Sequence, residues 1–243
     1  MKRTLQALAG ISQKRSPKTV AVVTMLGSFC PITLAHSQAF DEARRLLLDP
    51  DLRPNELEDF DHVLGFISAN PDHYVSRKFS DGVVPISYDD RLNLAKMAIQ
   101  DKSDWMGVEE EEGQTALLLK HKYRTLKFVH FTMNGADDVI KSRKWKWANS
   151  ENRFITMGRP GETARLLERM KHAKAEFGPN FVLGPELPDL SSTAAREALL
   201  NRDLESLNRM LHPEVTEWCL LHGPWREDEQ YIAKQEELSQ TVF

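Results

Sequence analysis

The sequence contains few cysteines and no long apolar run. Its 243 residues include only two cysteines, Cys30 and Cys219, which lie far apart and form neither a disulfide framework nor a spaced set of metal ligands. No segment approaches the roughly 18 to 20 apolar residues of a membrane-spanning helix. We therefore expect no membrane association and a reducing compartment, either the cytoplasm or the nucleus.

Charge of one sign is also lacking. Lysine and arginine number 32 and aspartate and glutamate 36, which gives a formal net charge of −4. Binding to a nucleic-acid backbone draws on a basic excess, because phosphate contacts and counterion release supply most of its affinity. The balance thus disfavours a nucleic-acid partner. The composition, 41% hydrophobic and 28% charged, is that of a globular chain with a substantial core.

Several chemical motifs are missing. Neither the dinucleotide fingerprint G-x-G-x-x-G nor the phosphate loop G-x-x-x-x-G-K-[ST] follows a predicted strand. The zinc motif H-E-x-x-H and paired cysteines are absent as well. Dehydrogenases, P-loop enzymes and zinc hydrolases are therefore disfavoured. We expect no metal ligands from the protein, so that a metal ion would arrive with a nucleotide.

The ends differ in charge from the middle. Residues 1–19 carry five basic and no acidic residues, and residues 224–243 are acidic. We interpret the first segment as a solvated arm, with a transit peptide or a nuclear address as the alternative. No Pro/Gly/Ser-rich linker divides the rest. We expect a basic arm at 1–19, one domain at 20–223 and an acidic tail at 224–243.

Between the ends, short apolar runs alternate with helical patterns. The run Val20–Leu26 is rich in β-branched residues and predicts a buried strand, and a helical pattern follows from Thr33 to Leu48. Further strands are predicted at 63–69, 105–108, 125–133, 154–157 and 181–183. Further helices are predicted from residue 87, at 114–122, after residue 137, and at 162–172, 193–200, 203–210 and 213–222. This order predicts an α/β fold with a parallel sheet, helices on both faces and a helical C-terminal part.

Two connections stand out in this pattern. Residues 70–86 read as a long polar loop, of the kind that is often functional or mobile. The acidic run 109–112 reads as a solvated turn before the helix at 114–122.

The segment GSFCPITLAH, residues 27–36, joins the first strand to the first helix. Gly27 permits a ligand to approach the backbone closely, and the free N–H groups at the helix start attract an anion. His36, one turn into the helix, would add a donor. The segment therefore predicts a phosphate site, with a plain turn and a capping or core histidine as the alternative.

A second segment, LSSTAAR, residues 190–196, opens a late helix. Its hydroxyl residues suit a helix cap, and Arg196 lies one turn further on, where it could reach a phosphate. The alternative is an ordinary cap with a surface arginine. The first motif makes that alternative less attractive.

Taken together, the two motifs resemble the nucleotidyltransferase signatures, in the form found in eukaryotic-type nicotinamide mononucleotide adenylyltransferases. The middle of the chain extends the resemblance from about residue 20 to 223. The matching segments are Ile67-Ser68-x-x-x-Asp72-x-Tyr74, Val84-Pro85, Ser103-x-Trp105, Gly135-Ala136-Asp137 and Arg159-x-Gly161.

The resemblance implies a Rossmann-like fold and a transfer reaction. The 5′-phosphate of nicotinamide mononucleotide, or of nicotinic acid mononucleotide, would attack the α-phosphorus of ATP. The products would be NAD, or deamido-NAD, and pyrophosphate, with Mg²⁺ bound to the ATP phosphates. Such transfers ask a protein mainly for positioning and charge stabilisation. The small-molecule partners would be ATP and the mononucleotide, and a homo-oligomer stays open.

The resemblance also implies roles for particular residues. His36 and Arg196 would be catalytic. The ATP-binding residues would be Gly27, Ser28, Phe29, Thr33, His36, Gly135, Asp137, Ser192, Thr193 and Arg196. The mononucleotide-binding residues would be Ser28, Tyr74, Lys78, Thr115, Trp147 and Arg159.

Two positions depart from the family pattern. Cys30 stands where asparagine is usual, and Ala194 where lysine is usual, with Lys78 as a candidate replacement for the missing cation. Either Trp145 or Trp147 would serve as a stacking tryptophan. Two alternatives remain: an adenylyl or cytidylyl transferase for another phosphorylated acceptor, and a nucleotide-binding sensor without turnover. The Lys-Met-Ser-Lys-Ser loop of class I aminoacyl-tRNA synthetases is absent.

Overall fold

A computed structural model describes residues 18–79, 85–109 and 114–225 of the chain. The predicted arm at 1–19 and tail at 224–243 lie almost entirely outside these residues. The strands are β1 (Thr19–Gly27), β2 (His62–Ala69), β3 (Met106–Val108), β4 (Lys127–Gly135), β5 (Arg153–Gly158) and β6 (Phe181–Glu186). The α-helices are α2 (Leu34–Leu48), α3 (Asp72–Lys78), α4 (Tyr88–Ala98), α5 (Thr115–Lys122), α6 (Ala136–Ser142), α7 (Glu162–His172), α8 (Ser192–Leu200), α9 (Leu204–Met210) and α10 (Pro213–His222). Two short 3₁₀ helices are η1 (Gln100–Lys102) and η2 (Lys144–Lys146).

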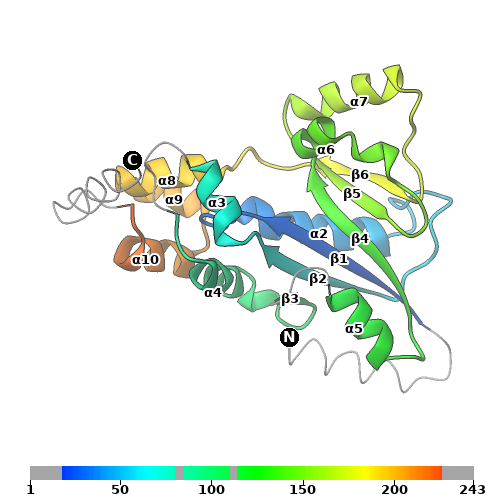
Figure 1. Cartoon of the computed structure of the whole chain (residues 1–243), viewed down its shortest axis with the longest axis horizontal. Helices are drawn as coiled ribbons and strands as arrows, with labels where there is room; N and C mark the ends of the chain where they lie inside the picture. Colours follow the sequence, from blue (N-terminus) through cyan, green and yellow to red (C-terminus); the bar gives the residue numbers. More distant parts are fainter. Residues whose placement is uncertain (1–17, 80–84, 110–113, 226–243) are drawn as a thin grey trace. The chain divides into compact units, whose positions relative to one another are not determined.

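The six strands form one sheet in the order β3-β2-β1-β4-β5-β6 (Figure 1). The registered pairs β2·β3, β1·β4, β4·β5 and β5·β6 are all parallel. This is the strand order of the Rossmann fold, so the predicted α/β class is confirmed. The order reverses between β1 and β4, and ligands of doubly wound sheets bind outside the carboxyl ends of the strands at such a point.

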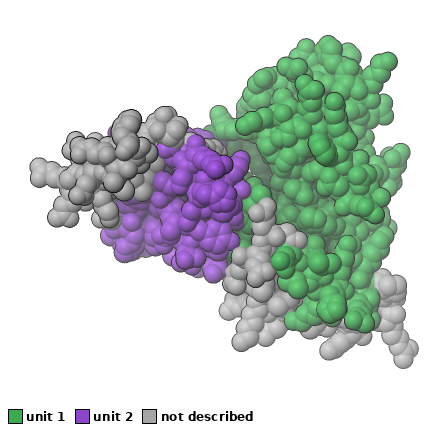
Figure 2. Space-filling view, viewed as in Figure 1, with its two compact units in different colours: residues 1–26, 35–68, 101–189 green, residues 27–34, 69–100, 190–243 purple. Residues whose placement is uncertain are grey.

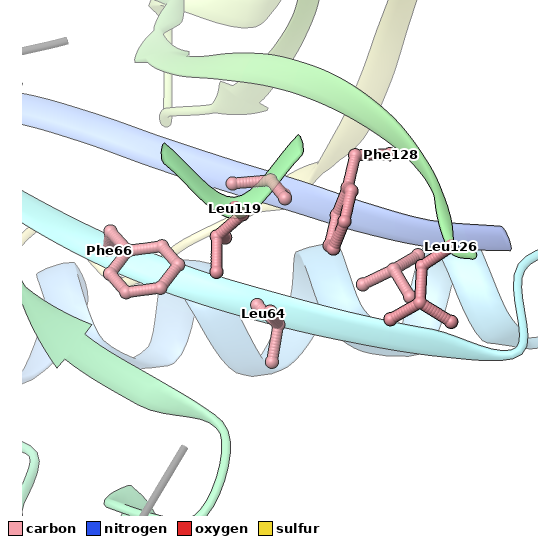
Figure 3. Packing of buried hydrophobic residues seen from close by; sticks show 7 residues of the cluster. Leu64, Phe66, Leu119, Leu126 and Phe128 are labelled. Atoms are coloured by element: carbon pink, nitrogen blue, oxygen red, sulfur yellow. The ribbon is translucent and has the colours of Figure 1, made fainter. Parts of the chain in front are cut away.

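Both faces of the sheet are covered by helices, as the sequence predicts. Leu64 and Phe66 of β2 point to the face that Leu119 of α5 covers, in a buried cluster with residues of β1 and β4 (Figure 3). Gly65, between them, points to the opposite face, where an added Cβ would lie 2.7 Å from the ring of Phe40 on α2. This period of two is that of a strand buried on both faces.

A second cluster fills the β5–β6 side of the sheet. Phe154 and Phe181 meet edge to face with their ring centroids 6.3 Å apart, and Leu166 and Met170 of α7 pack on them together with residues of α6. Leu166 and Met170 are four residues apart and thus lie on one stripe of α7, which explains why its pattern was readable in the sequence.

The chain divides into two compact units (Figure 2). Unit 1 comprises residues 1–26, 35–68 and 101–189 and holds the sheet with its covering helices. Unit 2 comprises residues 27–34, 69–100 and 190–243 and holds the loop before α2 and helices α3, α4 and α8–α10. Within unit 2, α10 packs on α4 and α9, and α8 packs on α9. No helix within the described ranges is long and apolar enough to cross a membrane.

Three sequence-based expectations need correction. The predicted loop 70–86 contains the two-turn helix α3, which is held by the buried Val75 and by an ion pair of Asp72. Strand β4 begins at Lys127 rather than at residue 125, because a turn bond from Leu126 N to the Tyr123 carbonyl precedes it. The acidic run begins with a buried residue, Glu109, and not with a solvated one; residues 110–112 lie outside the described ranges.

Candidate functional site

The predicted phosphate loop, Gly27–Leu34, follows β1 and leads into α2. Phe29 has a left-handed backbone with φ of 44° and folds its ring back onto Gly27. A Cβ at Gly27 would lie 2.6 Å from Cζ of this ring, so a larger residue there would displace the ring of Phe29. Phe29 and Thr33 are both buried, which favours a role for these two side chains in shaping the loop.

Polar side chains from two helices bind the carbonyl groups of this loop. Three donors reach it from α4 and α8: Arg91 to Ser28 O (3.1 Å), Arg196 to Cys30 O (2.8 Å) and Ser192 to Pro31 O (2.8 Å). Each bond joins segments more than 60 residues apart in sequence. The two predicted motifs therefore meet through direct hydrogen bonds in unit 2.

Helix α8 begins as the second motif predicts. The hydroxyl of Ser191 caps it by accepting a bond from Ala194 N at 3.0 Å. Arg196 also donates to Oγ1 of Thr193 at 3.1 Å, and its guanidinium lies 4.5 Å from the centre of the Phe79 ring. Burial lowers the pKa of Arg196, but an arginine starts so far above neutral that it keeps its charge.

Helix α3 carries two of the predicted mononucleotide-binding residues. Tyr74 projects from it with 55% of its surface exposed, so its ring is available for stacking. Lys78 ends the helix, and its side chain lies outside the described part of the structure. The helix is fixed at its first residue, Asp72, which accepts a bond from Arg91 at 2.7 Å.

In unit 1, three predicted residues gather at the carboxyl ends of β4 and β5. Gly135 ends β4, and a Cβ there would lie 2.6 Å from Oδ1 of Asp137, so glycine allows this carboxylate to fold over the strand end. Arg159 follows β5 and lies 4.0 Å from Asp137. It also donates from Nε and Nη2 to Asp189, at 2.9 and 2.7 Å. A carboxylate and a guanidinium thus stand together beside the switch point.

The predicted residue Thr115 opens α5, where its N–H is bound by Glu109 at 3.0 Å. The carboxylate of Glu109 also accepts a bond from the hydroxyl of Ser68. His130 binds Oγ1 of Thr24 at 2.8 Å. Burial is the main cause of the lowered pKa of His130, and Glu109 opposes that shift.

The remaining predicted residues lie in unit 1. His36 is half-buried in the first turn of α2. Trp147 follows η2 and is 64% exposed, whereas Trp145 packs against the cluster of Phe154 and Phe181. Exposure thus favours Trp147 over Trp145 as the tryptophan that meets a ligand.

Two buried charged residues, Arg91 in unit 2 and Glu109 in unit 1, were not predicted from the sequence. Arg91 is completely buried in α4, on the same stripe as Leu94, Ala95 and Ala98. A charged residue on an apolar stripe was the available signal, because burial of an arginine requires several partners. Glu109 gave no comparable signal, since it stands in a run of acidic residues.

No group of three or more histidine, cysteine or acidic side chains in the described ranges is arranged to hold a metal ion. The phosphate loop is surrounded instead by hydroxyl and guanidinium donors, which suit an anion. Both cysteines are free and buried, and burial raises the pKa of Cys219 to about 12.

Comparisons with known proteins bear on these motifs. No family model matches the chain. A probable nicotinate-nucleotide adenylyltransferase of Caldicellulosiruptor saccharolyticus is 26% identical over 149 residues, which cover 57% of this chain and 74% of that protein.

Solved structures show a similar fold. Plasmodium falciparum nicotinic acid mononucleotide adenylyltransferase complexed with NaAD superposes with a TM-score of 0.53 at 16% identity, over 86% of this chain and 97% of that one. The same enzyme complexed with APC gives a TM-score of 0.53 at 17% identity, over the same shares. The sequence match and the shared fold confirm the resemblance of this chain to nucleotidyltransferases of the nicotinamide and nicotinic acid mononucleotide adenylyltransferase kind.

Proposed function

We propose that the protein transfers the adenylyl group of ATP to nicotinic acid mononucleotide or nicotinamide mononucleotide, forming deamido-NAD or NAD and pyrophosphate. The observation that carries the proposal is the contact between the two predicted motifs, in which Arg196 and Ser192 of α8 bind the backbone of the loop 27–34. Two segments with separate phosphate-binding patterns are thus joined by direct hydrogen bonds. The named relatives point to the same chemistry.

The phosphates of ATP are assigned to the loop and the start of α8. With carbonyls of Ser28, Cys30 and Pro31 turned toward protein donors, the loop keeps one fixed shape. Helix α2, which follows it, is 15 residues long, and the positive end of its dipole lies at its start. Ser192, Thr193 and Arg196 add hydroxyl and guanidinium donors.

His36 is assigned to the transferred α-phosphate. In the reaction, an oxygen of the mononucleotide 5′-phosphate forms a bond to the α-phosphorus of ATP while the bond to the β-phosphate oxygen breaks. The attacking phosphate is mostly ionised at neutral pH, since its second pKa is about 6. No general base is therefore required, and the protein's task is to align the two phosphates and stabilise the added negative charge.

Magnesium is assigned to the polyphosphate of ATP. Mg²⁺ usually keeps several waters and is held through substrate phosphates with one or two carboxylates. The donors around the loop suit that arrangement, because they bind anions and leave the ion to the substrate. When bound, the ion would neutralise charge on the leaving pyrophosphate.

Exposed side chains within each unit offer candidate groups for the nucleoside parts. Asp137, at the end of β4, suits the hydroxyls of a ribose, and the neighbouring Arg159 suits a phosphate or a carboxylate. Tyr74 and Trp147 offer exposed aromatic faces for a pyridine ring, and Thr115 offers a hydroxyl. The names of the relatives favour the acid mononucleotide as the acceptor.

The test is a direct product assay with the full chain. Purified protein, ATP and Mg²⁺ are incubated with each pyridine mononucleotide, and dinucleotide and pyrophosphate are quantified by chromatography. Equal amounts of dinucleotide and pyrophosphate are expected. Pyrophosphate release only with a different phosphorylated acceptor would move the assignment to another transferase. Nucleotide binding without any product would indicate a sensor.

A further inference from the structure

Arg91 in α4 is a buried charged residue of unit 2 with several hydrogen-bond partners. Its side chain has no exposed surface. It donates from Nη1 to Ser28 O (3.1 Å) and Asn70 O (2.7 Å), from Nη2 to Asp72 Oδ1 (2.7 Å), and more weakly from Nε to Ile86 O (3.3 Å). A buried guanidinium is costly unless its donors are paired, and here all three nitrogens are.

The partners of Arg91 belong to two different parts of the proposed site. Ser28 lies in the phosphate loop. Asp72 is the first residue of α3, which presents the exposed ring of Tyr74 two residues later. Asn70 stands between them in sequence, directly after β2. One side chain therefore connects the element assigned to the ATP phosphates with the element assigned to the acceptor.

The planar fork of arginine suits this connection. Its five N–H donors leave the guanidinium in fixed directions, whereas lysine offers one flexible point charge. A role in stability alone would not need this geometry, because apolar residues often replace buried ion pairs without loss of stability. The three apolar neighbours on the same stripe of α4, Leu94, Ala95 and Ala98, would have accommodated such a residue.

We propose that Arg91 is a positioning residue that fixes the phosphate loop relative to α3, so that ATP and the acceptor are held at one distance and angle. The inference rests on the proposed function. Phosphoryl transfer depends strongly on such alignment, and displacement of a reacting group by about 1 Å can cost about 100-fold in rate.

A change at Asp72 can test the bond of Arg91 to α3 separately from the bonds of Arg91 to Ser28 and Asn70. Its side chain is 57% exposed, and its carboxylate contacts Arg91 only through Oδ1. Loss of this charge would release α3 and leave the bonds of Arg91 to Ser28 and Asn70 in place. The acceptor side of the site should then be affected more than the ATP side.

The experiment compares Arg91→Lys, Asp72→Asn and the double variant with wild-type protein. The control is Arg153→Lys, which alters another largely buried arginine whose partner, Glu58, lies outside the proposed site. For each protein, kcat, the KM for ATP, the KM for the mononucleotide and the melting temperature are measured. Arg91→Lys should lower kcat about 100-fold. Asp72→Asn should raise the KM for the mononucleotide about tenfold and leave the KM for ATP unchanged.

The double variant should have the same KM for the mononucleotide as Arg91→Lys, because both substitutions break the same bond, the one between Arg91 and Asp72. The inference is overturned if Arg91→Lys lowers the melting temperature as Arg153→Lys does but leaves kcat and both KM values unchanged. If Arg91→Lys does not fold, the Asp72→Asn variant, which changes an exposed side chain, provides the test. An unchanged KM of that variant for the mononucleotide overturns the inference. A wild-type protein that forms no dinucleotide would overturn the proposed function, and this inference with it.

Discussion

Arg196 donates from Nη1 to the carbonyl oxygen of Cys30 at 2.8 Å, across 166 residues of sequence. This bond ties the start of α8 to the loop between β1 and α2. The guanidinium also lies over the ring of Phe79, a contact that fixes its plane. In the proposed reaction, Arg196 would act on a phosphate in two ways, by its own charge and by holding the loop.

Replacement of Arg196 by alanine should raise the KM for ATP about 10- to 100-fold, the usual cost of losing a charged hydrogen-bond partner. Steady-state kinetics with ATP as the varied substrate measure this change. Arg209→Ala is the matched control, because Arg209 is an exposed arginine of the same unit that pairs with Glu205 on its own helix. Equal KM values in both variants would contradict the assignment of Arg196.

His36→Ala should lower kcat by about 10²- to 10³-fold, which is the typical effect of removing one preorganised donor from a developing charge. The KM for ATP should change less, since the donor acts mainly in the transition state. His172→Ala serves as the control, because His172 is an exposed residue at the end of α7. A kcat of His36→Ala near the wild-type value would contradict the catalytic role assigned to His36.

Gly27→Ala should destabilise the fold by about 1 to 3 kcal/mol, since the new methyl group overlaps the ring of Phe29. The loop must move to relieve the overlap, so kcat should fall as well. Denaturant unfolding and the product assay measure the two effects. Gly178→Ala is the control, because a Cβ there meets no atom within 4 Å. A second change, Phe29→Leu, should restore part of the lost stability.

The stability of the protein should depend on pH through His130. Burial lowers the pKa of His130 in the folded chain below its ordinary value of about 6.5, so the unfolded chain binds this proton more readily. The contribution of His130 is complete above about pH 6.5 and is lost as the pH falls through the lowered pKa.

Urea unfolding at pH 7.5 and pH 5.5 measures this effect. The free energy of unfolding should fall between the two values in wild-type protein and fall less in His130→Gln, whose amide can still bind Thr24. The carboxylates whose pKa is lowered, such as that of Asp61, lose their contribution only at more acidic pH. The same decline in both proteins would contradict the assignment.

Much of the fold could be predicted from the sequence, because the structure that each local pattern favours is also the one that tertiary packing stabilises. The β-branched run from Val20 predicted β1, and Ser87 with Asp90 predicted the start of α4, where the hydroxyl of Ser87 indeed accepts a bond from Asp90 N. Helix α7 was predicted with the bounds it has, Glu162–His172, since its apolar residues lie on one stripe. Each of these elements can be predicted from an apolar pattern or a capping residue within its own segment.

The missed features depend on partners far along the chain. Helix α3 is short and is held by the bond between Asp72 and Arg91, which no local pattern reveals. Glu109 is buried because Ser68 and the N–H of Thr115 satisfy its carboxylate. The motifs predicted which residues would surround a phosphate, but not that Ser192 and Arg196 also bind the loop backbone.

The most direct test of the proposed reaction follows the α-phosphate of ATP. The protein is incubated with Mg²⁺, nicotinic acid mononucleotide or nicotinamide mononucleotide, and ATP labelled at the α-phosphate, and the products are separated. We predict that the label moves into the pyridine dinucleotide, with one pyrophosphate formed for each dinucleotide and no label on the protein. Label that stays in ATP, or appears only in AMP, with both acceptors would contradict the account.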